Sequence, residues 1–311
     1  MSPPVGVVAM AYGTPASPDD VEAYYTRVRG GRPPPPEVLD DLRRRYRAIG
    51  GVSPLARRSR AQAAGLQAAL DGMEPGRFTV RLGYKHAPPF IEDAVDAVIA
   101  AGARHLVALV LAPHYAAASV GQYLDRARRR AAHGGGDVAV TGIESWHLEP
   151  AYLDFLVAQV RAARSRLPAA SKVLFTAHSL PRRAVRDDPY PGQVRETGAA
   201  VATRVGLDPC PGWAVAWQSA GRTPEPWLGP DLGHVIRRLG ATGRATGVLV
   251  CPCGFVSDHL EVLYDLDVEA RRVAGEVGLA WARTAMPNDD ATVLGALALR
   301  VGRAVAAIPA R

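Results

Sequence analysis

The chain has 311 residues, of which 48% are hydrophobic, so there is enough apolar material for two packed domains. Only 22% of the residues are charged, which excludes a disordered tail or a low-complexity polymer. The net charge of +7 favours an anionic partner, but charge alone does not distinguish nucleic acid, a membrane surface and a polycarboxylate or phosphate ligand.

The N-terminal segment predicts a first strand and not a targeting signal. It has no basic start, and its apolar run stops at Tyr12. The longest apolar run, 106–113, is far shorter than a membrane span, so we expect no integral membrane segment. The cysteines, Cys210, Cys251 and Cys253, do not make a disulfide scaffold. We therefore expect a protein of the reducing cytoplasm.

Short apolar, β-branched runs alternate with longer amphipathic stretches along the chain. The expected strands are 5–11, 79–83, 105–112, 138–142, 173–177, 214–217, 247–251 and 279–283. The expected helices are 59–70, 91–101, 150–167, 193–205 and 290–307. Nearly continuous apolar strands that alternate with helices are typical of parallel sheets covered on both faces. The pattern predicts an α/β protein.

The predicted strands fall into two sets of four, before and after the helix near 150–167. We expect two Rossmann-like domains, 1–150 and 151–311, each a mostly four-stranded parallel sheet flanked by helices. The last helix of the chain is expected to pack back on the first domain. Because ligands bind beyond the carboxyl ends of such strands, the cleft between the domains is the predicted site.

The segment 258–269 carries acidic residues at a helical spacing. If it is helical, Glu261, Asp265 and Glu269 line one face. Three stacked carboxylates repel one another, and a path for a hard cation would offset that repulsion. A solvated acidic face is the alternative on spacing alone.

His178 directly follows the predicted buried strand 173–177. A histidine at a strand end is either structural or turned toward a ligand. An imidazole opposite a carboxylate forms a site for a borderline metal ion or an acid/base pair.

Arginines are concentrated between residues 27 and 47, with tyrosine and serine nearby: Arg27, Arg29, Arg32, Arg43, Arg44, Arg45, Tyr46, Arg47 and Ser53. Guanidinium groups bind carboxylates in a bidentate manner, so the set suits a polycarboxylate ligand, and a solvated helix surface is the alternative. The basic residues lie in a proline-broken loop and one helix without an aromatic platform, so we expect no nucleic-acid partner.

Five groups of motifs occur in order along the chain: AYGTP at 11–15, YRAIGGVSP at 46–54, TAHSLP at 176–181, WQS at 217–219 with PWLGP at 226–230, and GFVSDHLE at 254–261. Together they resemble the ferrochelatase family nearly from end to end and with matching gaps. The likeness is strongest to the soluble bacterial branch that inserts iron into coproporphyrin III.

The resemblance implies roles for particular residues. His178 and Glu261 match the catalytic metal-site pair, and Asp265 and Glu269 match an acidic ladder that leads the cation in. Tyr12 matches an axial ligand that faces the iron from the other side. The positions that match the holders of the porphyrin and its propionates are Arg29, Arg45, Tyr46, Ser53 and Tyr123.

The implied reaction is that of a metal chelatase, a lyase of haem biosynthesis with Fe²⁺ and coproporphyrin III as substrates. No redox cofactor is expected, because the iron stays ferrous. Some relatives carry a [2Fe–2S] cluster, which needs four ligands, and this chain has three cysteines, so none is expected. We expect a monomer with transient contacts to neighbouring enzymes of the pathway.

Three alternatives remain beside this interpretation. The first is a ferrochelatase that uses protoporphyrin IX. The second is a cobalt or nickel chelatase that acts on a corrin precursor such as sirohydrochlorin. The third is a carrier of haem or porphyrin with Tyr12 as axial ligand. The full-length likeness counts against the second. A carrier has no need of the Glu261, Asp265 and Glu269 ladder.

Overall fold

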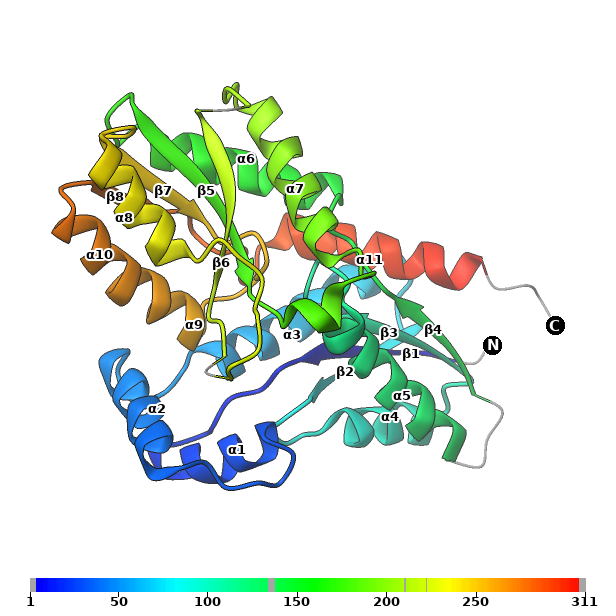
Figure 1. Cartoon of the computed structure of the whole chain (residues 1–311). Coiled ribbons are helices and arrows are strands. Elements are labelled where there is room, and N and C mark those ends of the chain that lie inside the picture. The colour runs from blue at the N-terminus through cyan, green and yellow to red at the C-terminus, as the bar shows by residue number, and fades with distance from the viewer. Residues whose placement is uncertain (1–3, 134–137, 210, 222, 308–311) are drawn as a thin grey trace.

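The computed structural model describes residues 4–133, 138–209, 211–221 and 223–307. Two parallel sheets of four strands each lie side by side in the molecule (Figure 1). The first contains, in spatial order, β2 (Phe78–Tyr84), β1 (Val5–Ala11), β3 (His105–Val110) and β4 (Ala139–Ile143). The second contains β6 (Trp213–Gln218), β5 (Ser171–His178), β7 (Gly247–Cys251) and β8 (Ala280–Arg283). The predicted α/β class is confirmed.

Helices connect and cover the strands. In chain order they are α1 (Val21–Val28), α2 (Pro36–Ala48), α3 (Leu55–Met73), α4 (Ile91–Ala100), α5 (Gln122–His133), α6 (Pro150–Arg164), α7 (Tyr190–Arg204), α8 (Leu232–Thr242), α9 (Leu260–Leu263), α10 (Arg271–Glu276) and α11 (Ala291–Ala306). Two π-helical turns, Ala117–Gly121 and Asp265–Ala270, interrupt the helical pattern.

The main apolar core is shared by the two sheets. Alternate residues of β1, such as Val7 and Ala9, and of β5, such as Val173 and Phe175, belong to one buried cluster with side chains of α3, α6 and α11. The outer face of the first sheet packs on α4 and α5, and that of the second packs on α8 and α10 (Figure 1). One continuous core therefore holds the sheets in a fixed relation.

The C-terminal helix α11 packs against α3 and against strands β3 and β4 of the first sheet. The approach is close, because a Cβ atom at Gly65 of α3 would lie 2.6 Å from Cδ1 of Leu294. The N-cap of α11 is satisfied by Asp290, whose carboxylate accepts hydrogen bonds from the backbone N–H groups of Thr292 and Val293.

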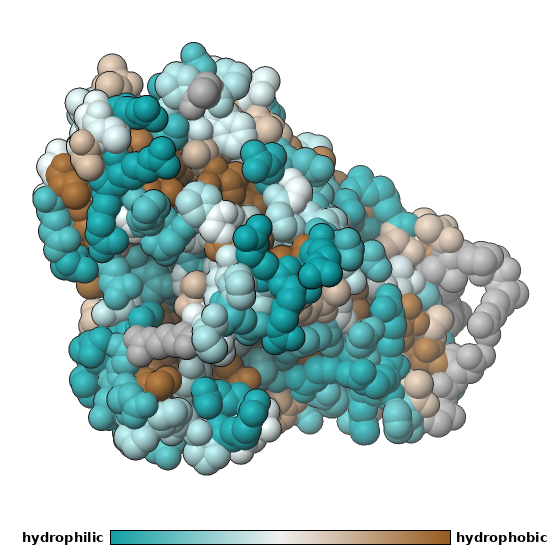
Figure 2. Space-filling model, in the orientation of Figure 1, coloured by the Kyte–Doolittle hydropathy of each residue, from teal (hydrophilic) through white to brown (hydrophobic). Residues whose placement is uncertain are grey.

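The surface in view is mostly hydrophilic, with small and scattered hydrophobic patches (Figure 2). Within the part of the chain that the structure describes, no helix is both long and apolar enough to cross a bilayer.

Candidate active site

A cavity of about 300 Å³ opens between the carboxyl ends of the two sheets. The end of β1 contributes Tyr12 to its wall, the end of β5 contributes His178, and the loop after β7 leads to Glu261. Much of the remaining lining is apolar or aromatic, with Leu42 and Tyr46 from α2 among it. A site at the ends of parallel strands is where such a fold binds ligands.

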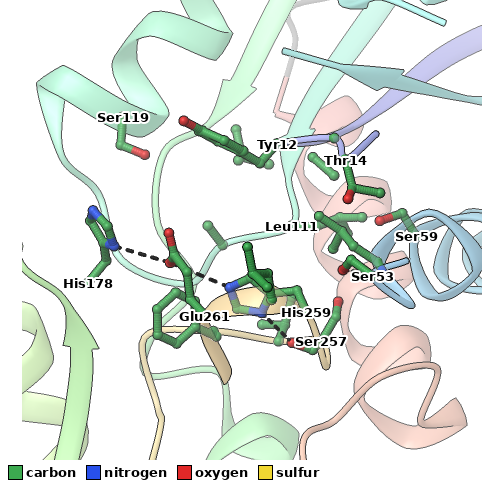
Figure 3. A pocket seen from close by; sticks show the side chains of 18 of the residues that line it. Tyr12, Thr14, Ser53, Ser59, Leu111, Ser119, His178, Ser257, His259 and Glu261 are labelled. Atoms are coloured by element: carbon green, nitrogen blue, oxygen red, sulfur yellow. Dashed lines mark hydrogen bonds and ion pairs between the residues drawn. The ribbon is translucent and has the colours of Figure 1, made fainter. Parts of the chain in front are cut away.

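The polar centre of this cavity is a carboxylate between two imidazoles. Oε2 of Glu261 lies 3.2 Å from Nδ1 of His178 and 3.6 Å from Nε2 of His259. The other nitrogen of His259, Nδ1, is 2.9 Å from the carbonyl oxygen of Ser257, which orients that ring (Figure 3). The predicted pairing of His178 with Glu261 is thus present in the structure.

These contacts shift the pKa values of both His178 and Glu261. Burial lowers the pKa of His178, but the charge and hydrogen bond of Glu261, with the charge of Asp265, outweigh burial and raise it overall. Burial raises the pKa of Glu261, but His178 and His259 outweigh it, so the pKa lies well below its usual range. The pair therefore favours an ionised carboxylate beside a protonated imidazole.

Tyr12 faces the cavity from the opposite wall. Its side chain lies across the cavity from Glu261 and His259 (Figure 3). The ring packs on His86, with 4.6 Å between ring centroids. Desolvation, and then the charge of Glu261, raise the pKa of the phenol, which favours its neutral form.

A second, polar pocket adjoins the first and holds the outer carboxylates. Asp265 and Glu269 line it together with Arg45 and Ser219. Arg45 donates to Oδ1 of Asp265 at 3.2 Å, and Ser219 donates to Oδ2 of the same residue. Burial and the charge of Glu261 raise the pKa of Asp265 to about 6, despite the opposing effect of Ser219 and Arg45.

The acidic segment departs from a regular helix. The α-helical turn α9 ends at Leu263, and the π-helical turn Asp265–Ala270 follows. Glu261 lines the first pocket while Asp265 and Glu269 line the second. The three carboxylates therefore form a series that runs from one pocket to the other.

The remaining predicted residues divide into two groups. Tyr46, Ser53 and Tyr123 are buried and line the first cavity. Tyr46 shares a 3.3 Å hydrogen bond with Thr14, and burial raises its pKa to about 12. Arg29 and Arg45 stand outside this lining: Arg29 donates to the carbonyl oxygen of Arg32, and Arg45 bridges Asp41 and Asp265.

The sequence reasoning missed His259 and Gln218. His259 lies inside the motif at 254–261, two positions before Glu261, so the motif carried a usable signal. Gln218 lies inside WQS, at the end of strand β6, and is 3% exposed.

Within the described ranges, no cluster of three or more His, Cys, Asp or Glu side chains is arranged to hold a metal ion.

Cys251 and Cys253 lie at and just after the end of β7, and both are fully buried. Burial raises the pKa of the Cys251 thiol to about 12 and that of Cys253 well above its ordinary value. Cys210 lies outside the described residues.

Solved structures of metal chelatases share this fold. The sirohydrochlorin chelatase of Bacillus subtilis subspecies spizizenii, solved with cobalt, superposes with a TM-score of 0.57 at 11% identity, covering 97% of this chain and 95% of that one. SirB from Bacillus subtilis with Fe³⁺ gives a TM-score of 0.59 at 14% identity, covering 97% and 96%. The chain therefore has the α/β fold, with two four-stranded parallel sheets, that these chelatases share.

Comparison with related sequences shows to which family the chain belongs. The Ferrochelatase family profile matches residues 4–305. A protein of Geobacillus thermodenitrificans is 45% identical over 94% of both chains, and one of Halalkalibacterium halodurans is 43% identical over 97% of both. Both are named coproporphyrin III ferrochelatase. The chain belongs to the ferrochelatase family, as the motifs predicted.

Proposed function

We propose that this enzyme inserts Fe²⁺ into coproporphyrin III and releases two protons, giving the ferrous coproporphyrin complex. The observation that carries the proposal is the Glu261 carboxylate, held between His178 and His259 and facing Tyr12 across the cavity. The names of relatives at 43–45% identity over nearly the whole chain support coproporphyrin III as the macrocycle.

In this proposal His178 and Glu261 form the metal-handling pair. A neutral imidazole and a carboxylate supply one nitrogen and one oxygen ligand and leave the other positions of Fe²⁺ open to pyrrole nitrogens. The two pyrrole N–H protons must leave as the Fe–N bonds form. Nδ1 of His178 and Oε2 of Glu261 lie within hydrogen-bond distance, 3.2 Å, so the pair is suited to accept a proton and pass it on.

Asp265 and Glu269 are proposed to lead the cation toward Glu261. Their series of carboxylates between the two pockets supports this route. Desolvation is less costly for a cation that meets a carboxylate at each step.

The macrocycle is proposed to bind mainly to the N-terminal domain, 1–150, and the metal pair to belong to the C-terminal domain, 151–311. Tyr46, Ser53 and Tyr123 would contact the ring inside the cavity, since all three line it. Arg29 and Arg45 would meet propionates that project beyond the cavity. The charge-assisted fit of guanidinium to carboxylate supports this part.

We further propose that the enzyme works without an iron–sulfur cluster, as a monomer, in the cytoplasm, with transient contacts to enzymes of the same pathway. The chain has three cysteines, while such a cluster takes four ligands. The buried Cys251 and Cys253 are held as thiols, which disfavours metal ligation. Visible absorption of anaerobically purified protein tests for the cluster, and the mass of the protein in solution tests whether it is a monomer.

The central test is an anaerobic metallation assay. Purified protein is mixed with Fe²⁺ or Co²⁺ and with coproporphyrin III, protoporphyrin IX or sirohydrochlorin, and the Soret band is followed. We expect turnover with coproporphyrin III at the highest kcat/KM. Binding of porphyrin without metallation would instead identify a carrier, and preferred use of sirohydrochlorin with Co²⁺ would contradict the proposal.

A further inference from the structure

Gln218 connects the strand that carries His178 to the turn that carries Glu261. It is the direct partner of His178 in the parallel register of β5 and β6. Its side-chain oxygen accepts a 2.8 Å hydrogen bond from the hydroxyl of Thr176, and its side-chain nitrogen donates to the backbone carbonyl of Glu261 at 3.3 Å. Its own carbonyl accepts from the backbone N–H of Ser179 at 2.7 Å. These bonds fix the distance between the two elements.

Ser219 continues this connection toward the second pocket. Its φ of 60° lies in the left-handed region, which a residue with a Cβ atom adopts only where surrounding contacts hold it. The turn aims its hydroxyl at Asp265, to which it donates a hydrogen bond. The side chain of Gln218 also reaches Ser219 Oγ at 3.5 Å. The backbone strain is therefore used to place a donor on the outer carboxylate.

We propose that Gln218 and Ser219 are a pair of positioning residues that set the metal affinity of this enzyme. Gln218 sets the separation of His178 from Glu261, and Ser219 sets the orientation of Asp265. The inference rests on the proposed function in one respect, that these side chains handle the metal substrate. Nothing in the bonding pattern requires Gln218 or Ser219 to touch metal or porphyrin.

The amide of Gln218 is chemically specific in this place. One end of the group must accept from a hydroxyl while the other donates to a carbonyl, which a carboxylate cannot do. A glutamate in its place would have the same shape but would put a further negative charge beside Glu261 and Asp265. A methionine would fill the same volume without either hydrogen bond.

The test uses purified full-length Q218M, Q218E, S219A and S219G. Zn²⁺ affinity is measured by calorimetry, the d–d absorption of bound Co²⁺ reports ligand geometry, and quenching of porphyrin fluorescence gives coproporphyrin III affinity. We expect Q218M to weaken Zn²⁺ binding about tenfold or more and to change the Co²⁺ spectrum, as loss of a group that orients metal ligands does. Coproporphyrin III affinity should stay within about twofold, because Gln218 lines the second pocket and not the first cavity, where the macrocycle is proposed to bind. The conservative variant T176S keeps the hydroxyl and should behave as the native enzyme.

A matched control is Q67M. Gln67 also bonds with both ends of its amide, to the backbone N–H of Val80 and the carbonyl of Phe78, but in the first domain and away from the metal pair. Q67M should lower the urea midpoint and leave Zn²⁺ affinity unchanged. If Q218M lowers the urea midpoint while Zn²⁺ affinity and the Co²⁺ spectrum remain native, Gln218 is a fold contact only and the proposal is wrong.

If the Gln218 variants do not fold, the serine variants test whether the positioning pair sets the metal affinity. S219A removes the hydroxyl, and S219G removes it while relaxing the backbone; both should weaken Zn²⁺ binding, S219G the more because the turn is then no longer fixed. Native Zn²⁺ affinity in both would overturn the role of Ser219. Failure of the proposed function looks different: the native protein would fail to metallate coproporphyrin III while the Zn²⁺ affinities still followed Gln218.

Discussion

Nδ1 of His178 lies 3.2 Å from Oε2 of Glu261, although the two residues are 83 positions apart in the chain. The end of β5 supplies the first and the turn after β7 supplies the second, and both strands are central in one sheet. The shared core of the two sheets fixes that relation. The pair is half-buried, so it is accessible from the cavity while burial strengthens the interaction between its members.

Replacing His178 with alanine should remove most of the activity and leave the fold intact. The side chain is 33% exposed and belongs to the cavity wall, so little packing is lost. Loss of one group that moves a proton costs about 10²–10⁴-fold in rate. Single-turnover metallation measures the rate, and circular dichroism with urea unfolding measures the fold. Retention of most of the native rate would remove His178 from the mechanism.

Metal affinity should rise with pH through the pKa of His178. Metal binding requires the neutral imidazole, and Glu261 holds the pKa of His178 above its ordinary value of 6.5. Below that pKa, the logarithm of the Zn²⁺ association constant should increase by about one per pH unit, and above it the curve should level off. In Glu261→Gln the levelling point should move to lower pH. An identical pH profile in both proteins would show that His178 is not the titrating ligand.

The same pair makes stability depend on pH in two directions. His178 has a raised pKa, so its contribution is complete below 6.5 and is lost as pH rises through the folded-state value. Glu261 has a lowered pKa, so its contribution is present above 4.5 and is lost as pH falls. The pair therefore stabilises the fold most between about pH 4.5 and pH 6.5, where both contributions are complete.

Coproporphyrin III should be preferred over protoporphyrin IX, because it carries four propionates and the latter two. Arg29→Ala should reduce this preference, since each charge-assisted contact contributes about 1.5–3 kcal/mol when partly desolvated. Arg45→Ala should reduce it too, and it should also lower the KM for metal, because the positive guanidinium that contacts Asp265 at 3.2 Å is removed and no longer repels the cation. Steady-state kinetics with both porphyrins and with varied Fe²⁺ separate the two effects. Equal use of both porphyrins by the native enzyme would contradict this prediction.

The strands were predictable because their apolar, β-branched runs depend on local sequence alone. Residues 5–11 and 247–251 were predicted with the bounds that β1 and β7 have. A helix was expected among the basic residues 27–47, but its bounds were not predicted, because α2 begins at Pro36, the last of a run of prolines that resembles a loop, although proline suits the first turn of a helix.

The site was predictable only in part, for a physical reason. His178 and Glu261 follow from strand ends and motifs, which are local features. The direction of Arg45 depends on how α2 packs beside a residue 220 positions away, and no local pattern encodes it. The π-helical turn Asp265–Ala270 likewise cannot be inferred from the regular spacing of its carboxylates.

Gly254→Ala should destabilise the protein and disturb the metal pair. A Cβ atom at Gly254 would lie 2.4 Å from Cβ of Ala177, next to His178, so the loop that leads to Glu261 must move. We expect a loss of about 1–3 kcal/mol in the free energy of unfolding and weaker Zn²⁺ binding. Gly295→Ala is the control: nothing lies within 4 Å of its Cβ position in α11, so it should be neutral or stabilising by up to about 1 kcal/mol. Urea unfolding measures the free energy of unfolding, and calorimetry measures the Zn²⁺ affinity. Native values of both in Gly254→Ala would contradict this prediction.

Tyr12→Phe should preserve much of the chelatase activity and change the spectrum of bound ferric coproporphyrin III. A phenolate is a hard anionic ligand that suits ferric better than ferrous iron, and the raised pKa of Tyr12 keeps the phenol neutral until such an ion displaces its proton. Phenylalanine retains the ring that packs on His86, so the cavity wall should stay in place. Visible and resonance Raman spectra of native and variant complexes, recorded side by side, test for the iron–phenolate bond. Identical spectra would mean that Tyr12 is not the iron ligand, and a large loss of Fe²⁺ insertion in the variant would place Tyr12 in the metallation step itself.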